Sequence, residues 1–252
     1  MPKPIEVYFW PTPNGHKITI ALEEMQLPYT LNAVNINKGD QFKPAFLAIS
    51  PNNRMPAIVD PDGPGGAPIS VFESGAILQY LGRKSGALYP QDERKRVDVE
   101  QWLFWQVGGL GPMSGQAGHF RSYAPKLVSD PAKVEYGRER YTREVNRLYG
   151  VLDRRLADRD YLAGEYSIAD IASWPWMRNF ASYDQKLEDF PKVKAWFERI
   201  GARDAVQRAL SAGAALRAKA LADQSAEEMA ESAKVLFGQT AQSVAEACAK
   251  QG

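Results

Sequence analysis

One change of pattern, near residue 90, restricts this chain to a two-part fold. Before it, short apolar runs typical of strands alternate with apolar residues at helical spacing; from about Asp92 onward the periodic segments are helical. A strand–helix–strand start predicts a parallel pair, and two short strands around a Gly/Pro hairpin predict an antiparallel edge. The expected strands are 5–10, 29–36, 57–60 and 68–72, with helices after 11–15, over 41–50 and from 73–74.

These patterns divide the 252 residues into three segments. We expect an α/β domain over 1–88, an all-helical domain over 92–212 and a helical C-terminal extension over 213–252. The extension is rich in alanine, and Ser225 and Glu228 are spaced as a capping box. It is either a packed accessory helix or a frayed tail.

The composition disfavours several classes of function. A net charge of +1 gives no reason to expect nucleic acid or a membrane surface as a partner. Cys248 is the single cysteine, so an internal disulfide and a Cys-X-X-Cys pair are impossible; with two histidines, we expect no metal site. We therefore expect a cytoplasmic protein in which the sulfur for any thiol chemistry comes from outside the chain.

A first candidate site lies where the first strand gives way to the first helix, at 12–17. Thr12 and the free amides of that helix start would stabilise an anion, and a thiolate is a good candidate. An ordinary helix cap is the alternative, because Thr and Asn are common there.

Two further candidates follow along the chain. Pro56 precedes an apolar strand, where a cis bond after Met55 would let that residue's backbone pair with a bound peptide. Glu73 and Ser74 open a helix, where they suit the ammonium and the carboxylate of an α-amino acid. A turn proline and a simple cap are the alternatives.

The order and spacing of these features resemble the glutathione transferase superfamily, from about Ile5 to Leu210. The run 167–172 resembles the capping box of that family's helical domain. The runs 12–18, 50–53 and 101–113 are similar to those of bacterial Nu-class members, related to the yeast prion-type transferase homologues. The resemblance implies a thioredoxin-like N-terminal domain and a helical C-terminal domain.

The resemblance also implies a set of ligand-binding residues. Thr12 and Asn14 would hold the glutathione sulfur, whereas Tyr8, on the first strand, is expected to serve in packing. One or two glutathione molecules, or one oxidised glutathione, would bind. The chain would form a homodimer, in which each subunit lends the other Arg140. The tripeptide would be held by Gln41, Arg54, Met55, Glu73 and Ser74.

Three functions are compatible with such a site. The first is thiol-disulfide exchange by bound glutathione as thiolate. The second is formation or cleavage of thioethers with an aromatic or electrophilic substrate, for which Tyr123 and Tyr183 are candidate pocket residues. The third is glutathione binding without catalysis, because fold does not fix function.

Overall fold

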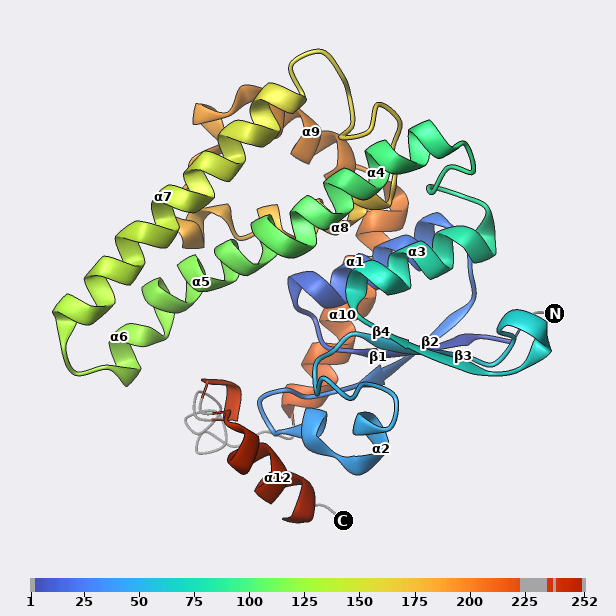
Figure 1. Ribbon diagram of the computed structural model, residues 1–252, viewed down its shortest axis with the longest axis horizontal. Coiled ribbons are helices and arrows are strands. Elements are labelled where there is room, and N and C mark those ends of the chain that lie inside the picture. The colour runs from blue at the N-terminus through green and yellow to red at the C-terminus, as the bar shows by residue number, and fades with distance from the viewer. Residues whose placement is uncertain (1–2, 223–234, 238, 251–252) are drawn as a thin grey trace. The chain divides into compact units, whose positions relative to one another are not determined.

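A four-stranded mixed sheet forms the centre of the first of two units in the computed structural model (Figure 1). The structure describes residues 3–222, 235–237 and 239–250. The first unit comprises the described residues up to Leu81 and from Arg208 onward, and the second is Gly82–Gln207. The expected capping box at Ser225 and Glu228 lies outside the described residues.

The sheet has the strand order β2-β1-β3-β4. β1 and β2 run parallel, and β3 is antiparallel to both β1 and β4. The predicted parallel pair and antiparallel edge are confirmed, although β1 and β2 end earlier than the apolar runs suggested. The strands are β1 (Ile5–Phe9), β2 (Tyr29–Ala33), β3 (Ala57–Asp60) and β4 (Ile69–Phe72).

Alternation along β1 places helices on both faces of this sheet. The Phe9 ring packs edge-on against His16 of α1 at 5.5 Å, whereas Tyr8 points to the other face, 6.2 Å from Phe46 of α2. α1 and α3 therefore lie on one face of the sheet and α2 lies on the other, as Figure 1 shows. The helices of this unit are α1 (Pro13–Glu24), α2 (Pro44–Leu47), most of α3 (Ser74–Ser85), most of α10 (Asp204–Ala222) and α12 (Ala241–Lys250), with 3-10 turns at Asp40–Phe42 and Pro64–Gly66.

The second unit is helical. α7 packs along α5 and buries an apolar stripe that contains Val134, Val145, Leu148 and Leu152. A π-helical turn, Gln106–Leu110, joins α4 to α5. The helices are α4 (Glu93–Trp105), α5 (Gly111–Ser122), α6 (Ala124–Leu127), α7 (Pro131–Arg155), α8 (Ile168–Met177) and α9 (Pro191–Gly201), with 3-10 turns at Phe180–Tyr183 and Leu187–Asp189.

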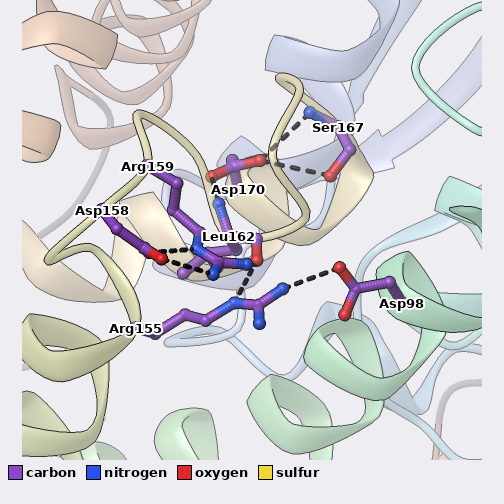
Figure 2. A network of polar contacts seen from close by, with 7 residues as sticks. All are labelled: Asp98, Arg155, Asp158, Arg159, Leu162, Ser167 and Asp170. Atoms are coloured by element: carbon purple, nitrogen blue, oxygen red, sulfur yellow. Dashed lines mark hydrogen bonds and ion pairs between the residues drawn. The ribbon is translucent and has the colours of Figure 1, made fainter.

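Asp170 organises the interior of this unit, and the predicted capping box with Ser167 is confirmed. Its buried carboxylate accepts hydrogen bonds from the Leu162 amide at 3.0 Å, the Ser167 amide at 3.1 Å and the Trp196 indole at 2.9 Å. Burial raises the pKa of Asp170 to about 6, against the lowering effect of these donors. Beside it, Arg155 joins the Leu162 carbonyl to Asp98 (Figure 2).

Across the described ranges, every helix is too short or too polar to cross a bilayer.

Candidate functional site

The start of α1 is built on Thr12. This residue is the N-cap, with extended backbone angles, and its Oγ1 accepts a hydrogen bond from the Gly15 amide at 3.3 Å. The same hydroxyl donates to the Met55 sulfur at 3.5 Å. Asn14 follows in the first turn of the helix and is half-buried. Thr12 is thus a cap, as the simpler interpretation proposed, and also a donor already directed at a sulfur atom.

The cis bond expected at Pro56 is present between Met55 and Pro56. Met55 lies over the start of α1, and its methyl carbon is 2.9 Å from the point where a Cβ on Gly15 would stand. The helix start at 12–17 and the turn that contains Met55 and Pro56 therefore meet at one end of the sheet.

The third segment, at the start of α3, combines one exposed and one buried side chain. Glu73 has a left-handed backbone with φ of 67° and is exposed, and its carboxylate accepts a hydrogen bond from Asn52 Nδ2 at 3.1 Å. Ser74 is 8% exposed, and its hydroxyl accepts a hydrogen bond from Lys17 Nζ at 3.2 Å. An exposed carboxylate thus stands next to a hydroxyl at a helix N-terminus, where partial positive charge accumulates.

Lys17 is a member of this site that sequence reasoning missed. It belongs to α1 and is 2% exposed. Burial lowers its pKa to about 7, and the Glu73 carboxylate opposes that shift. A signal was available, because Lys17 stands four residues before Ala21 and so falls on the apolar face of the expected helix.

Two of the predicted tripeptide ligands differ in accessibility. Arg54 is exposed, and its carbonyl accepts a hydrogen bond from the buried Ser50 hydroxyl at 2.8 Å. Gln41 is 2% exposed and donates from Nε2 to the Ile36 carbonyl at 3.3 Å. Its Oε1 accepts no hydrogen bond from any residue that the structure describes. In this conformation Gln41 offers almost no surface to a ligand in solvent.

The C-terminal segment reaches the same edge of the first unit. α12 packs against the 3-10 turn that contains Gln41. Asn53 donates a hydrogen bond to the Gln239 side chain at 3.4 Å. The segment therefore lies beside two of the loops that carry predicted ligands.

The Tyr8 hydroxyl is directed at a carboxylate of its own strand. It donates to Glu6 at 3.2 Å, and burial together with the Glu6 carboxylate raises the pKa of Tyr8. The Tyr8 proton is therefore already donated to a carboxylate, whose negative charge would repel a second anion at this hydroxyl.

In the second unit, Arg140 is exposed on α7 at a cavity of about 350 Å³. Two neighbouring arginines in the cavity wall are paired along the helix, Arg143 with Glu139 at 2.8 Å and Arg147 with Glu144 at 2.7 Å. The lining consists of Tyr136, Glu139, Arg140, Arg143, Glu144 and Arg147.

The two candidate pocket tyrosines differ in exposure. Tyr123 is the C-cap of α5, and Tyr183 lies in the 3-10 turn Phe180–Tyr183, beside Gly118 of α5. Tyr123 is 42% exposed and stacks on His119, with ring centroids 6.3 Å apart. Tyr183 is 4% exposed, packs against Gly118, and has a pKa raised by burial to about 12. The structure thus presents Tyr123 to solvent and encloses Tyr183.

Within the described part of the chain, no three His, Cys, Asp or Glu side chains gather as metal ligands would.

Comparisons with known proteins point to one family. The family model for the glutathione S-transferase N-terminal domain matches residues 12–84, and that for the C-terminal domain matches 120–204. The disulfide-bond oxidoreductase YfcG of Escherichia coli is 52% identical over 82% of this chain and 94% of its own length. A second Escherichia coli protein, the disulfide-bond oxidoreductase YghU, is 40% identical over 81% of this chain and 73% of its own.

Solved structures give a consistent result. A glutathione transferase from Burkholderia graminis, with two glutathione molecules bound per subunit, matches with a TM-score of 0.78 and 46% identity over 82% of this chain and 87% of that one. A glutathione transferase from Pseudomonas putida, with one glutathione disulfide bound per subunit, matches with a TM-score of 0.76 and 46% identity over 82% and 90%.

Proposed function

The chain belongs to the glutathione S-transferase family, and from that premise we propose that it is a cytoplasmic glutathione-dependent thiol-disulfide oxidoreductase. The relatives named disulfide-bond oxidoreductases and the related structure that holds glutathione disulfide support this reaction. Bound glutathione, as thiolate, attacks one sulfur of a disulfide and releases the other as a thiol. A second glutathione thiolate attacks the mixed disulfide, giving glutathione disulfide and a second thiol.

The observation that carries the proposal is the hydrogen bond from the Thr12 hydroxyl to a sulfur atom. Met55 Sδ, at 3.5 Å, is a weak acceptor for this hydroxyl, and a thiolate in its place would be a strong one. Thr12 also caps α1, whose N-terminus favours negative charge. We assign Asn14, the second residue of α1, as the second donor to the thiolate. Together these groups lower the glutathione thiol pKa and raise the thiolate fraction.

The remaining groups fit a tripeptide. The backbone of Met55, beside the cis bond, pairs with the cysteinyl residue in the manner of an added strand. Glu73 takes the ammonium and Ser74 the carboxylate of the γ-glutamyl end. Gln41 and Arg54 contact the rest of the molecule, Gln41 after it turns out of its buried position.

Arg140 completes the site from a second subunit in this proposal. An exposed arginine at the mouth of a cavity, flanked by arginines that already hold glutamates, is suited to bind a carboxylate from outside the subunit. The active form is then a homodimer that binds two glutathione molecules or one glutathione disulfide in each site.

The test is glutathione-dependent reduction of 2-hydroxyethyl disulfide, followed through glutathione reductase. We expect robust turnover by the wild-type chain and a roughly 10- to 100-fold loss of kcat/KM in Thr12→Ala, equivalent to one to two pKa units of the thiol. Thr12→Ser keeps the hydroxyl and should retain most of the activity. Unchanged turnover in Thr12→Ala, with glutathione still bound, would contradict the assigned role.

A second candidate function is attack of the thiolate on carbon, in thioether formation or cleavage. The exposed Tyr123 ring, stacked on His119, offers an aromatic surface with a polar edge for such a substrate. Conjugation of 1-chloro-2,4-dinitrobenzene, with no reduction of the disulfide, would favour this function. Glutathione binding without either reaction would favour a non-catalytic role.

A further inference from the structure

A lysine lies beneath the start of α3, inside the first unit. Lys17 extends from α1, is 2% exposed, and donates from Nζ to the Ser74 hydroxyl at 3.2 Å. Burying an ammonium group costs folding free energy unless the group is hydrogen-bonded or paired with an opposite charge. A long apolar side chain would fill the same space without that cost. The same desolvation disfavours the charged form of Lys17 and lowers its pKa to about 7.

The direction of the hydrogen bond determines what Ser74 can do. Because its Oγ accepts from Lys17, the hydroxyl hydrogen remains available to donate to a group outside. A chain of two donors therefore runs from the interior toward the surface, and it ends at the first residue of α3. Hydrogen bonds in such a chain strengthen one another, most of all when the final acceptor is an anion.

Neighbouring groups set the polarity of this end of the molecule. The N-termini of α1 and α3 both carry partial positive charge. Glu73 supplies negative charge next to Ser74, and its carboxylate is exposed. A ligand end that carries both a carboxylate and an ammonium matches this pair of charges.

We propose that Lys17 is a positioning residue that fixes the Ser74 hydroxyl as a donor to the γ-glutamyl α-carboxylate of glutathione and supplies the positive charge behind it. This inference rests on the proposed function and deepens it. Lys17 does not contact the ligand, but acts through Ser74, so its effect on binding depends on whether the ligand carries that carboxylate.

The experiment compares two ligands by calorimetry near pH 7: glutathione and 4-aminobutanoyl-cysteinylglycine, which lacks only the γ-glutamyl α-carboxylate. We expect Lys17→Met to bind glutathione roughly tenfold more weakly than the wild type, as for loss of a charged hydrogen-bond partner. It should bind the analogue within about twofold of the wild type. Lys95→Met, which removes an exposed lysine of the second unit, should bind both as the wild type does.

Equal weakening of both ligands in Lys17→Met would overturn the inference, because it would mean that Lys17 only supports the fold. Failure of the wild type to bind glutathione would instead overturn the proposed function. Lys17→Gln keeps a donor toward Ser74 without the charge, so it provides the same comparison if the methionine variant does not fold. If Lys17→Gln discriminates between the ligands as the wild type does, the charge has no role.

Discussion

A Cβ atom on Gly15 would clash with the backbone carbonyl oxygen of Trp10. The turn from β1 into α1 is therefore closed more tightly than any residue with a side chain permits. This closeness holds the Thr12 hydroxyl and the Met55 side chain against each other at the start of the helix. The contact between the Thr12 hydroxyl and the Met55 sulfur thus depends on Gly15, a residue without a side chain.

Gly15→Ala should accordingly destabilise the protein and damage the site together. The new methyl group would also lie 2.9 Å from carbon atoms of Met55 and Phe9, so we expect a loss of about 2–4 kcal/mol in the free energy of unfolding. Gly150→Ala is the matched control, because its Cβ lies in ordinary contact on α7 and should stabilise by about 0.5–1 kcal/mol. Urea unfolding measures both; equal stability of the two variants would contradict the predicted clash.

Asp170→Ala should be among the most destabilising single changes in the second unit. It leaves the buried donors of Leu162, Ser167 and Trp196 without their shared acceptor, at a cost of about 3 kcal/mol or more. Asp158→Ala, in the same view (Figure 2), removes a carboxylate that is 73% exposed and should change stability by less than about 0.5 kcal/mol. Chemical denaturation should separate the two variants clearly; similar costs would mean that the Asp170 network does not stabilise the fold.

The pH dependence of stability should report the burial of Lys17. Its pKa is about 7 in the folded chain and near the ordinary value of about 10.4 when unfolded, so between these values the unfolded chain binds more protons. The free energy of unfolding of the wild type, relative to Lys17→Met, should therefore rise from pH 7.5 to 9, by up to about 1.4 kcal/mol per unit. Parallel curves for the two proteins would show that folded Lys17 keeps its proton throughout this range.

Removal of the C-terminal segment should favour glutathione binding. α12 and Gln239 lie against the loops that carry Gln41 and Asn53, so they compete with a tripeptide laid across those loops. The Asn53–Gln239 hydrogen bond contributes about 1 kcal/mol, and its loss in Gln239→Ala should tighten glutathione binding by roughly fivefold at most.

Two further variants extend this comparison of glutathione dissociation constants. Deletion of residues 223–252 should tighten binding at least as much as Gln239→Ala. Gln242→Ala, which removes a contact to Glu246 within α12, should leave the dissociation constant unchanged. Weaker binding after the deletion would mean that the segment contributes to the site.

The strands, turns and helix caps could be predicted because their signals are local. The apolar runs, the turn clusters and the Ser167–Asp170 spacing each contain the information for a strand, a turn or a cap. That these segments form one site was implied by the resemblance to the glutathione transferase superfamily, and no single pattern along the chain predicted it. The resemblance to the transferase superfamily then named the ligand that such a helix start would bind.

What could not be predicted depends on packing between distant segments. The burial of Lys17 and its bond to Ser74 join residues 57 positions apart, and the contact between Asn53 and Gln239 joins residues 186 apart. Neither pair carries a pattern that marks it in the sequence. The enclosure of Tyr183 and of Gln41 likewise follows from neighbours that only the folded chain supplies.

Thr12, at the cap of α1, contributes a hydroxyl group and no sulfur, so under the proposed function oxidation of the reacting sulfur falls on glutathione. The sulfur that reacts arrives with the ligand and leaves with it, so a sulfinic or sulfonic acid formed during turnover is carried on a small molecule that can be replaced. An alkylating agent would likewise consume glutathione and leave Thr12 intact, because a neutral hydroxyl is a poor nucleophile. An enzyme that depends on its own cysteine, by contrast, loses its reacting group when that thiolate is oxidised to the sulfinic or sulfonic acid.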